Sequence, residues 1–468
     1  MHKSFVKSKR SLIVLFVLAA GAANYAQQKT QVLPAITSER LLNGLQIYVA
    51  STPYLGDTMS IGLVVRYGST FDRIKKGGEA YLTSRMLGKA AEDRTYKDIQ
   101  AELNYLNATL EVRCDWDGIR LLIRGRSETY ERCLWLLYQI AGEAKFNDDE
   151  YAGIQGSLLK QLQAPEDPRQ RIRSQFESAL FAGTTYGRSL FGSPATVQNI
   201  TVGDVRFFYR RFFSPDQAAL VVAGSVPPQT VIQKARRLWG LWVRQDEVPF
   251  SFVRATEVAG RKIHLEDDPA SPAAQYVIGN LSPSREDTSF YAAFLAARIL
   301  QERLTQVLPT SRLSVFIEGR RQRGPFMIQG QAAADQAVGE ITKILDAIEN
   351  FKKSDVSAAD AARVQAQWIA EFGNSIGTPE GICNLLLDAE LYRLGSNYMV
   401  SFPELVRRCD PALIKEAAKN WLFPSGSILV VRGPAAALLP QLQSLGAVQA
   451  VKSSHRRIQS RAHQQADI

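Results

Sequence analysis

Histidine, which binds zinc and acts as a general base near neutral pH, is scarce in this sequence of 468 residues. The four histidines are His2, His264, His455 and His463, and three of them lie close to an end of the chain. His264 begins the segment His-Leu-Glu-Asp-Asp, whose composition could suit a metal, but we expect a strand followed by a solvated acidic turn there. Few histidines are therefore available in this chain to form a metal site or an acid–base centre.

The four cysteines, Cys114, Cys133, Cys383 and Cys409, give no metal motif either, because no two of them form a Cys-x-x-Cys pair. A zinc knuckle or a thioredoxin-type site therefore has no support. Two cysteines fall in each half of the chain, so an oxidising compartment would permit the disulfides Cys114–Cys133 and Cys383–Cys409. Four buried thiols are the equal alternative, since sequence alone does not fix connectivity.

Residues 77–87, Gly-Gly-Glu-Ala-Tyr-Leu-Thr-Ser-Arg-Met-Leu, follow a predicted strand at 61–70 and open a predicted helix. Two histidines at i and i+4 of a helix share one face and can bind one zinc ion, while a glutamate between them takes a proton from the metal-bound water. Ala80 and Ser84 have that spacing here, with Thr83 beside them. Alanine has no lone pair, and hydroxyl groups are poor zinc ligands compared with imidazole and carboxylate.

The segment and its setting resemble the first domain of the insulinase and mitochondrial-processing-peptidase family (M16) of zinc proteases. In that family, Gly-Leu-Ala-His-x-x-Glu-His-Met begins a helix after a strand that ends in Gly-Ser. The resemblance places Ala80 and Ser84 at the two histidines and Thr83 at the glutamate. The family's last ligand, a glutamate about 77 residues further on, falls on Gln161, which keeps an oxygen but lacks the charge. The resemblance thus implies a zinc-protease framework with no catalytic residue, no metal ligand and no cofactor of its own.

The sequence is also internally repeated. Residues 212–215 (Phe-Phe-Ser-Pro) and 220–224 (Leu-Val-Val-Ala-Gly) parallel 421–424 (Trp-Leu-Phe-Pro) and 429–433 (Leu-Val-Val-Arg-Gly) at a constant offset of 209 positions. We therefore expect an α+β protein made of two duplicated domains. The family resemblance implies that each is an antiparallel sheet flanked by helices, of the LuxS/MPP-like metallohydrolase type, and that paired domains close like a clamshell around a peptide.

Hydrophobic periodicity and turn residues predict the same series of strands and helices in both halves. Strands are expected near 42–49, 61–67, 108–114, 119–124 and 218–223, and again at 274–279, 312–318, 325–330 and 429–433. Helices are expected at 77–87, 96–106, 128–144, from 148 and from 201, and again at 288–304, 337–351 and 358–372. Asp167-Pro168 in the first half and Thr378-Pro379 in the second occupy the same place in this series.

Residues 1–26 have the basic start, short apolar run and small residues of a secretory signal peptide, so we expect a periplasmic or secreted protein. An uncleaved anchor is the alternative, and no later segment is long enough to cross a bilayer. We expect domains at 36–243 and 262–447, a linker at 244–261 and a basic, disordered tail at 448–468. The net charge of +10 falls to about +3 without the leader and tail, which is too little for a nucleic-acid surface.

In two-subunit bacterial members of the family, the subunit without zinc supplies an arginine and a tyrosine that help to bind the substrate. The matching region here has Pro309 or its neighbour at the arginine position, and Ser314 or Phe316 at the tyrosine position. Arg312 could take the place of that arginine, although an arginine at a strand edge is more often simply solvated. The basic turn 320–325, Arg-Arg-Gln-Arg-Gly-Pro, is expected to be a solvated hairpin tip, with a contact to an acidic partner as the alternative.

These observations favour an exported, non-catalytic member of the family that joins a zinc-containing subunit and completes its peptide-binding chamber. The expected partners are that subunit and a peptide, with no nucleic acid. A stand-alone extracytoplasmic binding or scaffold protein is the alternative from another functional class. The third hypothesis, an active zinc metalloendopeptidase with atypical ligands, is disfavoured by the ligand chemistry above.

Overall fold

The computed structural model describes residues 33–246, 248–250, 252–423 and 426–451. Contacts divide the chain into a unit of Met1–Ala35 and a larger unit of Ile36–Ile468, and the larger unit contains nearly all of the described elements. The signal peptide expected at 1–26 lies outside the described residues, as does the expected tail from residue 452 onward. Among the described helices, none combines the length and apolar character that crossing a bilayer requires.

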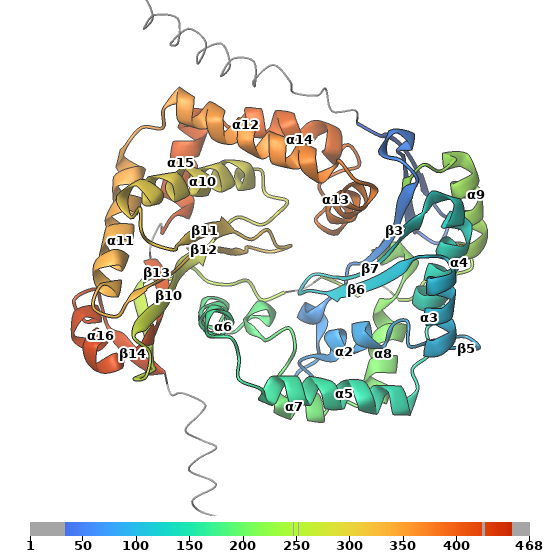
Figure 1. The fold of residues 1–468 in the computed structure, drawn as a ribbon, viewed down its shortest axis with the longest axis horizontal. Helices are drawn as coiled ribbons and strands as arrows, with labels where there is room; N and C mark the ends of the chain where they lie inside the picture. Colours follow the sequence, from blue (N-terminus) through green and yellow to red (C-terminus); the bar gives the residue numbers. More distant parts are fainter. Residues whose placement is uncertain (1–32, 247, 251, 424–425, 452–468) are drawn as a thin grey trace, which may run out of the picture. The chain divides into compact units, whose positions relative to one another are not determined.

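The first sheet has six strands in the order β1-β2-β8-β3-β7-β6. Its strands β3, β7 and β6 are labelled in Figure 1. They are β1 (Ala35–Arg40), β2 (Gln46–Ser51), β3 (Thr58–Val65), β6 (Thr109–Cys114), β7 (Ile119–Arg126) and β8 (Ala218–Gly224). β3 is antiparallel to both β7 and β8, and every residue of β3 after Thr58 is buried. A strand with no exposed face is apolar without alternation, because helices cover the sheet on both sides.

Helices of the first half surround this sheet and a small hairpin of β4 (Ala90–Ala91) and β5 (Arg94–Thr95). They are α2 (Glu79–Met86), α3 (Tyr96–Tyr105), α4 (Tyr130–Gly142), α5 (Asp148–Gln163), α6 (Pro168–Leu180), α7 (Pro194–Gln198), α8 (Val202–Phe212) and α9 (Pro228–Trp239). Thr201 caps α8 through a reciprocal bond with Asp204, as its sequence predicts. α2 packs against α5, α8 and β6, so it is held on three sides.

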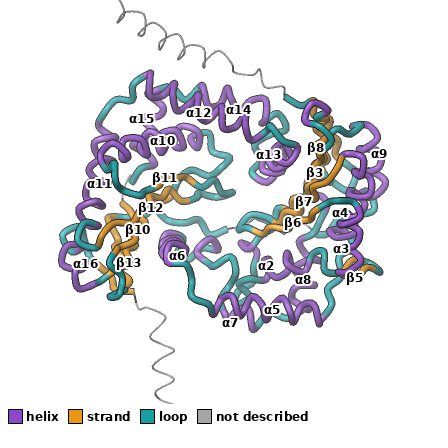
Figure 2. Tube along the Cα trace, in the orientation of Figure 1, coloured by secondary structure: helices purple, strands orange, loops and turns teal. Residues whose placement is uncertain are grey.

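The second sheet also has six strands, in the order β11-β12-β10-β13-β9-β14. Its strands β10, β11, β12 and β13 are labelled in Figure 2. They are β9 (Gly260–Asp267), β10 (Ala273–Leu281), β11 (Ser314–Ile317), β12 (Pro325–Ala333), β13 (Gly426–Gly433) and β14 (Val448–Val451). The helices of this half are α10 (Ser289–Val307), α11 (Ala337–Lys353), α12 (Ala358–Ser375), α13 (Pro379–Leu391), α14 (Tyr398–Arg407), α15 (Pro411–Trp421) and α16 (Ala435–Leu442). The fold is therefore mixed α and β, with two sheets flanked by helices, as expected. The sheets are not wholly antiparallel, because β2 is parallel to β8 and β9 is parallel to both β13 and β14.

One helix of each half packs on the sheet of the other half. α13, from the second half, packs on β3 and β8 of the first sheet, and α6, from the first half, packs on β10 and β13 of the second. Gly62 and Gly279 permit the close approach: a Cβ at Gly62 would lie 2.7 Å from the Sγ of Cys383, and one at Gly279 would lie 2.7 Å from the Cζ of Phe176. Both helices begin with proline at the first turn, at the Asp-Pro and Thr-Pro pairs that the sequence placed in equivalent positions.

The turn at 320–324 differs from its prediction as a solvated hairpin tip. The Arg320 side chain is only 2% exposed, and it forms ion pairs with Glu177 of α6 (2.8 Å) and Glu318 (2.9 Å). The backbone N–H of Arg321 donates to Asp117 of the first half at 2.9 Å. The turn is therefore buried between the halves, because carboxylates from both halves neutralise its arginines.

Two boundaries also differ from the sequence-based expectation. β9 begins at Gly260, inside the expected linker, and β14 (Val448–Val451) pairs with β9 where the tail was expected to begin. The linker residue Phe250 stacks on Tyr67 with ring centroids 5.1 Å apart, and the Tyr67 hydroxyl donates to the carbonyl of Val248. This connection is thus packed on the first half.

The segment that begins at His264 was expected to end in a solvated acidic turn. His264 and Glu266 instead lie within β9, and the Glu266 side chain is 2% exposed. It is neutralised by Arg171 of α6 at 2.7 Å and by Arg432 of β13 at 3.7 Å. The glutamate therefore joins α6 to the second sheet.

Candidate functional site: a pocket between helices α2 and α5

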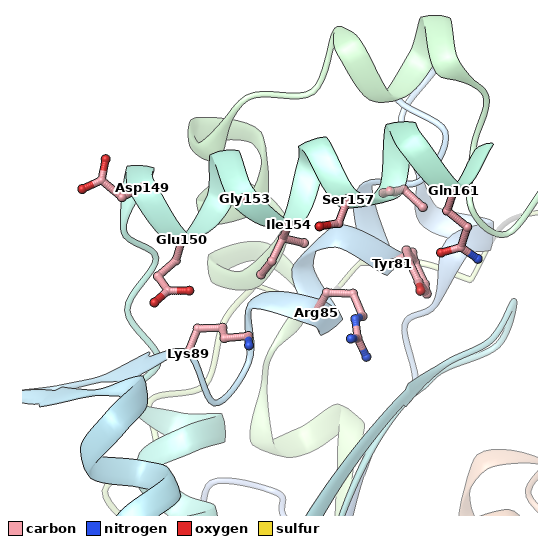
Figure 3. Close-up of a pocket in the computed structure, with 10 residues that line it drawn as sticks. Tyr81, Arg85, Lys89, Asp149, Glu150, Gly153, Ile154, Ser157 and Gln161 are labelled. Carbon is pink, nitrogen blue, oxygen red and sulfur yellow. The ribbon is translucent and has the colours of Figure 1, made fainter. Parts of the chain in front are cut away.

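Helices α2 and α5 border an open pocket of about 620 Å³ in the first half of the chain (Figure 3). α2 and the turn after it contribute Tyr81, Arg85 and Lys89, and α5 contributes the facing residues Asp149, Glu150, Gly153, Ile154, Ser157, Leu158 and Gln161. A pocket of this size can accommodate a small ligand or a short stretch of peptide.

The start of α2 is fixed by Asp72. Its two carboxylate oxygens accept the backbone N–H groups of Gly78 and Ala80, each at 2.7 Å. Gly78 has a φ of 95°, a left-handed conformation that favours glycine. Burial raises the pKa of Asp72 to about 8, although the two N–H bonds act in the opposite direction. Two helix N–H groups that lack intrahelical partners are thereby satisfied.

A charged network holds the loop that leads into α2. Arg73 pairs with the fully buried Glu79 at 2.5 Å and with Asp204 of α8 at 2.6 Å, and Lys76 pairs with Asp204 at 2.7 Å. Burial raises the pKa of Asp204, but bonds from Lys76, Thr201 and Arg73 outweigh it, so the net pKa is well below the usual range for an aspartate. The helix is therefore anchored at its first turn to α8.

Three of the four residues assigned from the sequence to the degenerate zinc site do not face this pocket. Ala80 and Thr83 are fully buried and Ser84 is 1% exposed. The Thr83 hydroxyl donates to the carbonyl of Glu79 (2.8 Å) and the Ser84 hydroxyl donates to that of Tyr81 (2.7 Å), so both are used within the helix. Gln161 does line the pocket. The residues of α2 that face Gln161 are Tyr81 and Arg85, which directly follow Ala80 and Ser84 in the sequence.

The pocket's donors do not fit a zinc ion. Tyr81, Arg85 and Gln161 supply a phenol, a guanidinium and a neutral amide, and a cation placed beside the guanidinium would be repelled. Across the part of the chain that the structure describes, no group of three or more His, Cys, Asp or Glu side chains is placed to hold a metal ion. Asp149 and Glu150 are only two carboxylates, at the far end of the pocket.

Two family descriptions match the sequence. "Insulinase (Peptidase family M16)" matches residues 48–193 and "Peptidase M16 inactive domain" matches residues 199–368. The chain belongs to peptidase family M16. The first match contains both helices of the pocket, and the second contains the linker and much of the second half.

Sequence relatives of this M16 chain are distant. An "Uncharacterized zinc protease" of Rickettsia bellii is 22% identical over 213 residues, covering 45% of this chain and 52% of that protein. The "Probable mitochondrial-processing peptidase subunit beta, mitochondrial" of Arabidopsis thaliana is 21% identical over 264 residues, covering 56% of this chain and 49% of that protein. The chain thus spans about half the length of these relatives.

Solved structures share the fold over most of the chain. A "peptidase M16 inactive domain" from Pseudomonas fluorescens has a TM-score of 0.78 at 18% identity, covering 86% of this chain and 98% of that one. The "periplasmic protease PqqL" from Escherichia coli has a TM-score of 0.72 at 15% identity, covering 87% of this chain and 46% of that one. These likenesses support the fold of the M16 chain.

The family motif can be placed in a second register that agrees with the pocket. If Gly78, Ala80 and Met86 are set on the Gly, Ala and Met of Gly-Leu-Ala-His-x-x-Glu-His-Met, the two histidines fall on Tyr81 and Arg85. The glutamate then falls on Ser84. The identities of Gly78, Ala80 and Met86 were therefore the sequence signal that could have identified the pocket-facing positions. The first register did not use these three matches. Either register leaves the M16 chain without the histidine pair.

Arg312 lies apart from this pocket. It is exposed just before β11 and lines a second open pocket of about 570 Å³ with Arg169 and Arg173 of α6. The two pockets have no lining residue in common. Arg312 is therefore placed beside other cations at the edge of the second sheet, and its role in binding a substrate stays a prediction.

All four cysteines are free in the structure, so neither expected disulfide is formed. The Sγ of Cys383 lies in the α13 contact with the first sheet, 3.9 Å from the carbonyl oxygen of Val221, whereas the Sγ of Cys409 approaches the carbonyl of Leu405 on α14. Cys133 contacts Thr129 at the start of α4, while Cys114 ends β6. Each expected pair is thus divided between different packing environments. Cys114 is half-buried and the other three are buried.

Proposed function

We propose that this M16 chain is a non-catalytic subunit that associates with a zinc-containing M16 subunit and completes its peptide-binding chamber. The observation that carries the proposal is the α2–α5 pocket, which has Tyr81, Arg85 and Gln161 on its walls where an active member needs metal ligands. The chain would then contribute part of the peptide-binding surface, but no metal ligand and no catalytic residue.

An exposed sheet edge beside the pocket supports a role in peptide binding. β6 is the end strand of the first sheet, and it contacts α2. An extended peptide can add to such an edge because the strand's outward N–H groups can donate, and its outward C=O groups can accept, main-chain hydrogen bonds. A peptide paired with β6 would pass close to α2, whose outward face carries Tyr81 and Arg85.

The association with a second subunit is supported by the family. The Arabidopsis thaliana relative is described as a subunit of a processing peptidase. Export is supported by the leader-like residues 1–26 and by the structural likeness to a protease described as periplasmic. The periplasm or the exterior is therefore the proposed location of the assembly.

Co-purification from the native host, together with metal analysis, tests this proposal. We expect the chain to elute with a second M16 protein carrying His-x-x-Glu-His, and we expect about one zinc ion per pair, removed by mutating the partner's histidines. A chain that elutes alone and still binds peptides would favour the scaffold hypothesis. One zinc ion per isolated chain, together with peptide cleavage, would favour the atypical-ligand peptidase.

A further inference from the structure

Arg85 differs from several arginines of the first half in having no carboxylate partner among the described residues. Arg73 pairs with Glu79 and Asp204, Arg120 pairs with Asp388, and Arg124 pairs with Glu380 at 2.6 Å. Within the described residues, no acceptor or carboxylate meets the Arg85 guanidinium, which is exposed to the pocket. A free guanidinium at the wall of a concave site is available to an anion from solution.

Three uncharged polar side chains border the same end of the pocket. The hydroxyl of Tyr81, the hydroxyl of Ser157 and the amide of Gln161 have no side-chain hydrogen-bond partner among the described residues. The Tyr81 ring is held by an edge contact with Phe191, with ring centroids 4.9 Å apart. Figure 3 shows Tyr81 opposite Gln161, with Arg85 next along α2. Each of these groups can donate a hydrogen bond to a bound oxygen.

The acidic residues of the pocket lie at its other end. Figure 3 shows Asp149 and Glu150 at the start of α5, with Lys89 on the facing side next to Glu150. The Lys89 ammonium also lies over the Tyr96 ring, 3.8 Å from its centroid. The lysine therefore offsets the acidic end, while Arg85 supplies unbalanced positive charge toward Tyr81 and Gln161. An anion is favoured at that end and disfavoured beside Asp149.

We propose that Arg85 binds a carboxylate group of the peptide, with Tyr81, Ser157 and Gln161 as additional donors. The planar guanidinium matches the two oxygens of a carboxylate, and such charge-assisted bonds are stronger than neutral ones. Where active members hold a zinc cation between two helices, this chain would hold the negatively charged end or side chain of its ligand. The inference rests on the proposed function only in taking the ligand to be a peptide.

The test measures binding of fluorescein-labelled, degenerate ten-residue peptide pools to the purified chain by fluorescence polarisation. One pool ends in a free carboxylate, the second in a C-terminal amide, and the third is the amide with one internal glutamate. The variants are Arg85→Gln, Arg85→Lys, and Arg408→Gln as a charge-matched control, since Arg408 is exposed and forms an exposed pair with Glu404. Circular dichroism and thermal melting verify that each variant is folded.

We expect the free-acid pool to bind about 10- to 100-fold more tightly than the amide pool, as a charged hydrogen-bonding pair contributes. Arg85→Gln should remove that difference, Arg85→Lys should retain part of it, and Arg408→Gln should leave it unchanged. If the internal glutamate restores binding to the amide, the carboxylate is a side chain. Equal binding of all three pools, or no effect of Arg85→Gln on the tighter-binding pool, would overturn the inference. Neither result bears on co-purification with a zinc subunit, which judges the proposed function separately.

Discussion

Glu177 and Arg320 come from opposite halves of the duplicated chain and form an ion pair of 2.8 Å in which both side chains are at least nine-tenths buried. The guanidinium of Arg320 also pairs with Glu318 and lies over the Trp116 ring, 4.2 Å from its centroid. Glu177 lies on α6, the helix of the first half that packs on the second sheet. The pair therefore joins the turn between β11 and β12 to this helix.

Replacing Arg320 with methionine should destabilise the fold by about 3–5 kcal/mol, because removing one partner leaves buried carboxylates with less neutralising charge. Arg173 remains beside Glu177 and Glu318, which favours the lower end of that range. Urea unfolding followed by circular dichroism measures the change. The control is Arg408→Met, which breaks an exposed i,i+4 pair and should cost less than about 1 kcal/mol. Similar midpoints for the two variants would show that the buried pair contributes little.

Replacing Gly62 with alanine should weaken the packing of α13 against the first sheet. The added Cβ would lie 2.7 Å from the Sγ of Cys383 and from Cδ1 of Leu387, so the helix or the strand must move, at a cost of about 1–3 kcal/mol. Burial raises the pKa of the Cys383 thiol well above its ordinary value, so the thiol should react slowly with a disulfide reagent in the unmodified chain and faster in the variant.

Gly156→Ala is the matched control for this substitution. A Cβ at Gly156 meets open space on α5, so alanine should stabilise that helix by up to about 1 kcal/mol and leave the thiol reactivity unchanged. An unchanged melting temperature and unchanged Cys383 reactivity in Gly62→Ala would contradict the tight contact.

Local signals in the sequence were sufficient for most elements. Asp117-Gly118 is a typical turn pair between the strands expected near 108–114 and 119–124, and in the β6–β7 hairpin Asp115 accepts the N–H groups of Asp117 and Gly118. Thr201 gave the start of α8, and the repeated Leu-Val-Val segments gave β8 and β13. These features depend on neighbouring residues alone, and therefore appear in a single sequence.

Features that depend on contacts distant in sequence could not be predicted in the same way. Periodicity does not say which sheet α6 or α13 covers, and a run of arginines at 320–323 looks solvated until Glu177 is placed beside it. The register of the motif on α2 also depends on a contact that is distant in sequence. Ala80 and Tyr81 are adjacent in sequence but point about 100° apart on a helix, and only the position of α5 decides which of them faces the pocket.

The network at the start of α2 predicts a pH dependence. Because the pKa of Asp204 is lowered in the folded chain, the unfolded chain binds more protons between the two pKa values, and the stabilisation by Asp204 is complete only above the unfolded value. It is then lost as the pH falls toward the folded value. Asp204→Asn should therefore cost about 1–3 kcal/mol at pH 7 and much less at pH 3. Urea midpoints at both pH values measure this, and an equal loss at both would exclude charge as the cause.

The two placements of the degenerate motif predict opposite outcomes for a designed zinc site. Tyr81→His, Arg85→His and Gln161→Glu together would place two imidazoles on the face of α2 that borders the pocket, with a carboxylate facing them from α5. We expect this threefold variant to bind about one zinc ion per chain, as measured by metal analysis after dialysis.

The companion variant makes the substitutions of the earlier register, Ala80→His, Thr83→Glu, Ser84→His and Gln161→Glu. Ala80 and Thr83 are fully buried, so a histidine and a glutamate there must enter a packed interior and should unfold the helix or the chain. Circular dichroism distinguishes loss of fold from loss of binding. If a folded companion variant bound zinc and the first variant did not, the two histidine positions of the motif would be Ala80 and Ser84. Arg85 would then not stand at a ligand position, and the proposal that it binds the peptide's carboxylate would lose its support.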